Sequence, residues 1–337
     1  MIVASFPVVF FLTLLAMVVG GNKFLKDWGF ETVIFSLLIG LFISNIFSIP
    51  KWLKESLSSE LFVKIGLVLL GTTVLFDDLL KAGALGLIQS CVVVFTVWNF
   101  CFWLCRKMKI DKEMSLMLSS AVSICGVSAA VATAGAIKGD KTKLSYVVSL
   151  VLVVAVPMIL IMPGLAKLMG LPEDMAGAWI GGTIDTTGAV AATGAIYGEV
   201  ALQTSTIVKF SQNVLLGVAA FLISIYWSYS KKEVTEEKPT LKVIWLRFPK
   251  FVLGFVAASL VFSFCVAPEV VSDAKPILKN IQGMWFALAF MSIGLETDFK
   301  SLITSENRRS TYAFLGAQAF NVVFTLLVAW ILFGLIA

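Results

Sequence analysis

An acidic side chain flanked by hydroxyl groups stands in the middle of an apolar stretch. The sequence "GGTIDTTGAV" at 181–190 places Asp185 two residues after Thr183 and directly before Thr186 and Thr187. Because a charge at bilayer depth is costly, such a carboxylate is a functional site by default. Together with Thr183 it suits the coupling of transport to Na⁺ or to H⁺, since hard cations prefer oxygen ligands. The alternative is a carboxylate that only caps the helix that follows it.

A lysine followed by two amide side chains lies in the next apolar segment. In "TSTIVKFSQN" at 204–213, Gln212 and Asn213 come three and four residues after Lys209, on the same face of a helix. A cation with two amides at this depth can bind an anion, so these three residues are assigned to substrate binding. The alternative is that the long side chain of Lys209 only carries its ammonium to the lipid headgroups.

A second stretch, "SICGVSAAVA" at 123–132, consists mostly of small residues. Gly126 in its middle favours a break in the helix, and the free amides at the start of a new helix attract anions. Ser123, Cys125, Gly126 and Ser128 are therefore expected to bind substrate. Thr186 and Thr187 take the same role in the other stretch, and the two stretches are expected to face one another near the bilayer midplane.

The elements that must position these residues are membrane helices. The chain has 337 residues, of which 59% are hydrophobic and 14% charged, and a mean hydropathy of +0.95. These values indicate an all-α polytopic membrane protein with a single transmembrane domain over 1–337. The apolar segments run roughly over 4–20, 29–48, 61–76, 84–105, 114–136, 144–168, 175–197, 201–227, 243–266, 282–297 and 311–337, with a polar loop at 228–242.

Two of these segments, 114–136 and 175–197, are predicted to be re-entrant or broken helical hairpins, which leaves about nine spanning helices. Residues 124–139 resemble 183–198, and 70–80 resemble 293–303, which predicts inverted repeats with a first half at 1–168 and a second half at 175–337. Hairpins place "KGDKTK" at 138–143 with the other basic loops in the cytoplasm, together with the N-terminus. Full crossing by both segments remains the alternative.

Five amide side chains lie in other apolar segments, namely Asn45, Gln89, Asn99, Gln318 and Asn321. An amide inside a membrane is stabilised by a partner on a neighbouring helix. These five are therefore expected to form hydrogen bonds between helices.

The sequence offers no chemistry typical of an enzyme. It lacks histidine and contains no Walker A motif, no G-x-S-x-G elbow and no cysteine pair spaced for a metal, so no metal site other than Na⁺ near Asp185 and no other cofactor is expected. The net charge is +5, but the sequence contains no nucleic-acid-binding motif, so nucleic acid is not an expected partner. The expected partners are a small anion and the lipid bilayer, and a homodimer is plausible.

Three stretches together resemble the YeiH-type sulfate exporter family, which is similar to the bile-acid and arsenite carrier superfamily. They are "SSAVSICGVSAAVATAGAIKG", "WIGGTIDTTGAVAATGAI" with the following "IVKFSQNVLL", and "ALAFMSIGLETDF". The resemblance implies secondary transport of an inorganic or small organic anion such as sulfate or a sulfonate. This chain has Asp185-Thr186 where the family usually has a His-Glu pair, which leaves Na⁺ and H⁺ open as the coupling ion.

The sequence therefore predicts a secondary transporter, an exporter or exchanger, in a bacterial inner membrane. In this hypothesis Lys209 and the hairpin amides hold the anion, and Asp185 couples a cation. The alternative is a cation-selective carrier or channel whose ligands are Asp185 and the nearby hydroxyls.

Overall fold

The computed structural model describes residues 2–20, 32–47, 49–50, 52–53, 57–231, 245–246, 248–297 and 308–336. Within this part of the chain there are thirteen α-helices and no strand. The predicted class, an all-α polytopic membrane protein, is confirmed. Most of the predicted polar loop, from residue 232 on, lies outside the described residues, as do residues 298–303 of the predicted repeat. The inverted repeats and the two halves stay predictions.

Nine of the thirteen helices stand alone, and the other four form two hairpins. Four helices of the described residues are long and apolar enough to cross a membrane. These are α6 (Phe76–Lys107), α9 (Lys141–Leu168), α12 (Glu199–Lys231) and α17 (Arg308–Ala329), the last continued by the π-helical turn η4 (Trp330–Ile336). The other five single helices are α1 (Ile2–Gly20), α3 (Thr32–Ile46), α5 (Ser59–Leu70), α14 (Phe251–Leu260) and α15 (Pro268–Glu296).

Some helices extend beyond the segments that hydropathy predicts. Helix α6 begins at Phe76 rather than near residue 84, with Asp77 and Asp78 in its first turn, where the amide end of a helix favours negative charge. Helix α12 continues to Lys231, so the polar loop begins after Lys231 and not at 228. Hydropathy marks only the apolar part of a helix, and the backbone hydrogen bonds continue past it.

The predicted hairpin at 114–136 turns back on itself. It consists of α7 (Lys112–Ser120), the π-helical turn η2 (Ala121–Cys125) and α8 (Val127–Ile137). Lys143, in the first turn of α9 just after α8, donates to Asp111, the N-cap of α7, over 2.7 Å. The outer ends of α7 and α8 therefore lie at the same end of the molecule, and full crossing is wrong for this segment.

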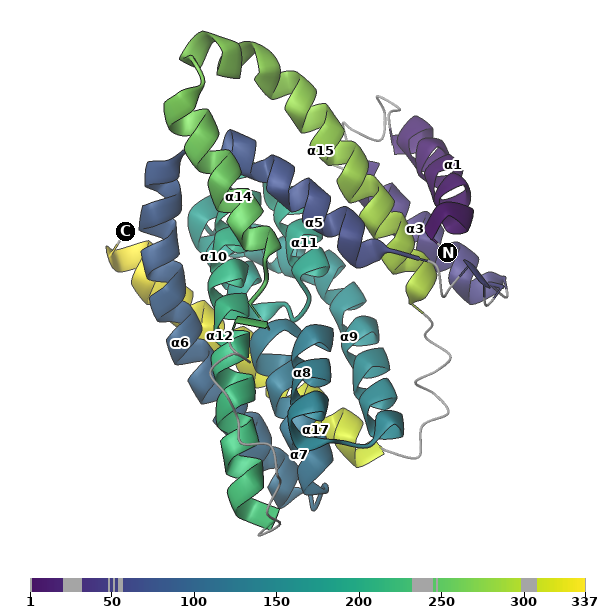
Figure 1. Cartoon of the computed structure of the whole chain (residues 1–337), viewed down its shortest axis with the longest axis vertical. Helices are drawn as coiled ribbons and strands as arrows, with labels where there is room; N and C mark the ends of the chain where they lie inside the picture. Colours follow the sequence, from purple (N-terminus) through teal and green to yellow (C-terminus); the bar gives the residue numbers. More distant parts are fainter. Residues whose placement is uncertain are drawn as a thin grey trace.

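The predicted hairpin at 175–197 is formed by α10 (Glu173–Thr183) and α11 (Thr187–Tyr197). The carboxylate of Glu173, at the start of α10, accepts from the amide of Val200, which follows α11, over 2.9 Å. This hairpin also enters and leaves at one end. Helix α9 connects the outer ends of the two hairpins along its whole length, so they enter from opposite ends, with α7 and α8 in the lower half of Figure 1 and α10 and α11 in the upper half.

Glycines bring the helices around the hairpins into close contact. A Cβ added at Gly177 of α10 would lie 2.7 Å from the carbonyl oxygen of Ala201 in α12. A Cβ added at Gly294 of α15 would lie 2.6 Å from the carbonyl oxygen of Leu37 in α3. Small residues therefore let neighbouring backbones touch, as expected for packing within a membrane.

Helices α1, α3, α5, α14 and α15 pack on one another and lie together in the upper part of Figure 1. Helices α6, α9, α12 and α17 surround the hairpins. The second hairpin contacts the first group at Gly188, where an added Cβ would lie 3.0 Å from Ile293 of α15 and 3.1 Å from Val63 of α5. It contacts the second group at the neighbouring Thr187, whose Oγ1 accepts from Nδ2 of Asn213 in α12 over 3.1 Å. The break in this hairpin is thus close to the boundary between the two groups.

Candidate functional site

The tips of the two hairpins touch at Gly126. This residue lies between η2 and α8 with φ +60° and ψ −113°, a conformation that glycine adopts without strain. A Cβ at this position would lie 3.2 Å from the Cβ of Asp185 and 3.2 Å from the Cγ2 of Thr186. The two sequence stretches that were expected to face one another do so, and Gly126 leaves room for the contact.

Lys209 connects both tips from α12. Its side chain is buried, and Nζ donates to the carbonyl oxygen of Ile124 over 2.6 Å and to that of Ile184 over 2.8 Å. A third bond goes to Oε1 of Gln212 over 2.8 Å. Both carbonyls stand at the C-terminal ends of first hairpin arms, where a helix favours positive charge. The alternative in which Lys209 extends to the headgroups is wrong, because only 1% of the residue is exposed.

The two amide side chains after Lys209 hold the second hairpin. Nε2 of Gln212 donates to the carbonyl oxygen of Gly182 over 3.0 Å. Nδ2 of Asn213 donates to Oγ1 of Thr187 over 3.1 Å. The predicted placement of these side chains beside Lys209 is therefore reproduced, with both amides bonded to protein atoms.

Helix α17 adds contacts to the site that the sequence analysis did not assign to it. Gln318 and Asn321 donate to the carbonyl oxygen of Thr183 over 3.0 and 3.1 Å, and Asn321 also donates to that of Val122 over 3.2 Å. The expectation of bonds between helices is confirmed for these two residues. It is wrong for Asn99, whose Nδ2 donates to the carbonyl oxygen of Phe95 in its own helix.

The two remaining amide side chains also bond to other helices. Nε2 of Gln89 on α6 donates to the carbonyl oxygen of Ala178 on α10 over 2.7 Å. Nδ2 of Asn45 on α3 donates to the carbonyl oxygen of Thr297, directly after α15, over 3.3 Å. Amide side chains thus form hydrogen bonds that connect the hairpins and the surrounding helices to one another.

Asp185 is buried without a donor to its carboxylate. Only 1% of the residue is exposed, and neither Oδ1 nor Oδ2 has a hydrogen-bond partner among the described residues. The cap of α11 is Thr186, whose Oγ1 accepts from the amide of Ala189 over 3.3 Å. The alternative in which Asp185 only caps α11 is therefore wrong. Oγ1 of Thr183 and Oδ1 of Asn213 are likewise buried and unpartnered.

The remaining predicted residues of the first hairpin differ in their placement. The hydroxyl of Ser123 in η2 donates to the carbonyl oxygen of Ser119, one turn earlier in α7, over 2.7 Å. Cys125 is buried directly before the break. Ser128 is exposed in the first turn of α8, whose N-cap, Gly126, provides no capping side chain. The structure thus gathers Gly126, Asp185 and Lys209 with their neighbours. The hydroxyl of Ser123 is bonded within its own arm, whereas Ser128 stands exposed two residues after Gly126.

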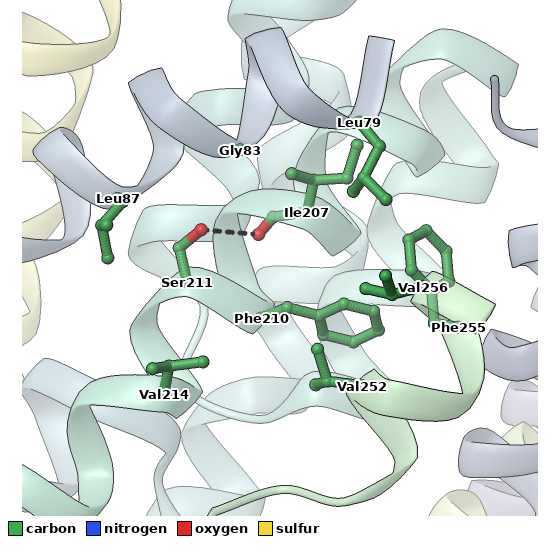
Figure 2. Close-up of a pocket in the computed structure, with 10 residues that line it drawn as sticks. All are labelled: Leu79, Gly83, Leu87, Ile207, Phe210, Ser211, Val214, Val252, Phe255 and Val256. Atoms are coloured by element: carbon green, nitrogen blue, oxygen red, sulfur yellow. Dashed lines mark hydrogen bonds between the residues drawn. The ribbon is translucent and has the colours of Figure 1, made fainter. Parts of the chain in front are cut away.

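An apolar cavity of about 230 Å³ lies between α6, α12 and α14 (Figure 2). Its lining includes Leu87, Phe210 and Val252, and its one serine, Ser211, donates to the carbonyl oxygen of Ile207 over 3.1 Å. The α12 residues of this cavity lie on the face opposite Lys209 and Gln212. A cavity without a charge or a free donor is unsuited to an anion, so the polar centre at the hairpin tips is the candidate site.

Comparison with known proteins places the chain among membrane proteins. The family model described as "Conserved hypothetical protein 698" matches residues 5–313. A UPF0324 membrane protein of Rhodopirellula baltica is 39% identical over 99% of this chain and 63% of its own length, and one of Nitratidesulfovibrio vulgaris is 38% identical over 97% and 59%. A UPF0324 membrane protein of Bacillus anthracis is 25% identical over 94% of this chain and 92% of its own length.

The chain thus spans less than two thirds of the length of the first two relatives. No solved structure matches it. The similarity to sulfate exporters and to bile-acid and arsenite carriers stays a prediction, whereas the family model covers most of the chain. The chain therefore belongs to the Conserved hypothetical protein 698 family of membrane proteins.

Proposed function

We propose that this membrane protein is a secondary active transporter, not an enzyme, and that it carries a small anion such as sulfate or a sulfonate between its two hairpin tips. One observation carries the proposal. Two broken hairpins enter from opposite ends and meet at Gly126 and Asp185. Transporters place substrate where interrupted helices meet at mid-membrane, because a small movement then opens the site to one side or the other.

The preference for an anion follows from the direction of the second hairpin arms. Helices α8 and α11 both begin at the tips, so their amide ends point to the site. Gly126 leaves the first turn of α8 without a side-chain cap, and Ser128 and Thr187 can add hydroxyl donors there. Lys209 is bonded to three protein oxygens in this conformation, so it becomes an anion ligand only by exchanging one of these bonds for a bond to substrate.

A second candidate, a cation-selective carrier, is favoured by the unpartnered carboxylate of Asp185. Both candidates place a cation, Na⁺ or H⁺, at Asp185. In the anion transporter this cation is coupled to movement of the anion, whereas the cation carrier transports no anion.

The orientation follows from the basic residues at one end of the molecule. Arg106 and Lys107 end α6, and Lys109 lies in the turn before α7. Lys138 follows α8 and Lys141 begins α9, and this turn lies beside the first one. Basic loops remain in the cytoplasm, so this end is assigned there, together with the N-terminus, in a bacterial inner membrane. A homodimer in the bilayer stays part of the proposal.

The test is counterflow of radiolabelled sulfate or methanesulfonate in proteoliposomes, with Na⁺ and pH gradients varied separately. An anion transporter exchanges label in one of these conditions, and Ser128→Val should raise the KM for the anion, since this exposed hydroxyl stands at the uncapped end of α8. The matched control is Ser149→Val, because the hydroxyl of Ser149 bonds its own helix. Radiolabelled Na⁺ flux without anion exchange would replace the proposal by the cation carrier.

A further inference from the structure

Buried oxygen atoms without partners are concentrated at the tip of the second hairpin. Seven buried side-chain atoms of the described residues lack a hydrogen-bond partner, and all seven are oxygens. Four of them belong to Thr183, Asp185 and Asn213. A fifth belongs to Gln318, whose amide nitrogen bonds the carbonyl oxygen of Thr183. Buried polar groups are almost always paired, so this cluster needs a specific explanation.

The three residues that supply four of these atoms lie close together. Thr183 and Asp185 are two residues apart, which limits the separation of their Cα atoms to about 7 Å. The side chain of Asn213 bonds Thr187, two residues after Asp185, over 3.1 Å. Its nitrogen is engaged in that bond, and its oxygen remains an acceptor without a donor.

These atoms can accept hydrogen bonds or bind a cation, but the part of the chain that the structure describes offers them no donor. Lys209 is a cation at the same hairpin tips, but its three bonds go to Ile124, Ile184 and Gln212 instead of Asp185. An ionised carboxylate at this position would therefore be buried without a hydrogen-bond donor among the described residues. Such a charge is stable in a protein only when a counterion or a proton neutralises it.

We infer that Asp185, Thr183 and Asn213 form a binding site for a monovalent cation, and that Na⁺ is its occupant. The site has a single carboxylate and neutral oxygens, which balances one positive charge. Sites for Ca²⁺ usually combine several carboxylates, and the described residues contain no group of three or more His, Cys, Asp or Glu that could hold a metal ion. Carboxylate, hydroxyl and amide oxygens are the hard ligands that Na⁺ accepts.

The site explains how a cation and an anion can be coupled, a role that rests on the proposed function. Asp185 directly precedes Thr186, the cap of α11, and contacts Gly126, the cap of α8. A bare carboxylate at these two helix starts repels an anion from the amides that would bind it. Bound Na⁺ removes that repulsion, so the cation and the anion bind together.

Binding of Na⁺ can be measured without any transport. The purified full chain in detergent is heated in NaCl solutions from 0 to 300 mM, with choline chloride holding the ionic strength constant. The expected result for the wild-type protein is a saturable rise in the midpoint of unfolding with Na⁺ and a smaller one with K⁺, because a ligand that binds only the folded state stabilises it. Equal midpoints in Na⁺ and choline at every concentration would overturn the inference.

Variants locate the site. Asp185→Asn should abolish the Na⁺ response, and Thr183→Val should raise the half-saturating concentration about tenfold, as expected for loss of one neutral ligand. The matched control is Asp77→Asn, which removes an exposed acid from the first turn of α6 and should keep the wild-type response. If Asp185→Asn does not fold, the comparison of Thr183→Val with the control decides alone. A wild-type response in Thr183→Val would then contradict the site.

Two further outcomes separate this inference from the proposed function. A midpoint that depends on pH and not on Na⁺ identifies a proton as the occupant and overturns the Na⁺ site. A Na⁺ response that depends on Asp185, in a protein that exchanges no anion, supports the cation site and refutes the anion transporter.

Discussion

The bonds of Lys209 provide a measurable prediction about stability. The variant Lys209→Met keeps an apolar side chain of similar length and removes the ammonium, so the carbonyl oxygens of Ile124 and Ile184 and the Oε1 of Gln212 lose their donor. A hydrogen bond within a membrane protein contributes roughly 0.6–2 kcal/mol. Three such bonds therefore predict a loss of about 2–6 kcal/mol in the free energy of unfolding.

The assay is reversible unfolding of purified protein in mixed micelles with increasing SDS. The matched control is Lys64→Met, because Lys64 is partly exposed and pairs with Glu60 one helical turn away over 2.8 Å. An exposed ion pair of this kind contributes about 0–1 kcal/mol. If the two variants lose the same stability within about 0.5 kcal/mol, the lysine does not fasten the hairpin tips and this reasoning is refuted.

Three further predictions concern the hairpins and the connections between them. Gly126→Ala places a Cβ at a positive φ, so the variant should unfold about 1–3 kcal/mol more easily in the same assay, and an unchanged stability would refute the tip contact. Cysteines introduced by Lys107→Cys and Lys141→Cys should react with an impermeant maleimide from one side of the membrane and Gly170→Cys only from the other. Labelling of Lys107→Cys and Lys141→Cys from opposite sides would contradict the hairpin between them. Amides of the first turn of α9 hold the pKa of Asp140 below its usual 3.8, so its carboxylate stabilises the fold above that pH and less as pH falls through the lowered pKa. The stability deficit of Asp140→Asn should shrink as pH falls below about 4, and a deficit independent of pH would contradict the cap.

The membrane class and both hairpins could be predicted from the sequence, because a lipid bilayer admits few backbone conformations. A backbone in hydrocarbon must bond itself, so apolar segments predict helices, and a glycine or an acid in the middle of a small-residue segment predicts a break in a protected place. The structure has a break at each predicted position, at Gly126 between η2 and α8 and at Asp185 between α10 and α11. The same reasoning gave the order of the helices but not their lengths, as the early start of α6 shows.

The partners of Lys209 could not be predicted in this way. A buried lysine in a transporter suggests an anion, yet its partners are two backbone carbonyls, and every residue has a carbonyl. Similarly, Gln318 bonds a residue 135 positions earlier in the chain, and helical periodicity does not say which helices become neighbours. Such contacts depend on how the helices pack, and the sequence pattern of one segment does not contain that information.

The arrangement of the two buried charges follows the polarity of the broken helices. Lys209 lies where the two first arms end and bonds their carbonyl oxygens, and Asp185 lies where the two second arms, α8 and α11, begin. Each charge thus faces helix ends of the opposite polarity, which lowers the cost of placing it at depth. Because both charges contact both hairpins, a relative movement of the hairpins changes the surroundings of Lys209 and of Asp185 at the same time. In the proposed transporter, a cation that binds Asp185 therefore acts at the contact between the two hairpin tips, which gives it a physical means to control the side to which the tips open.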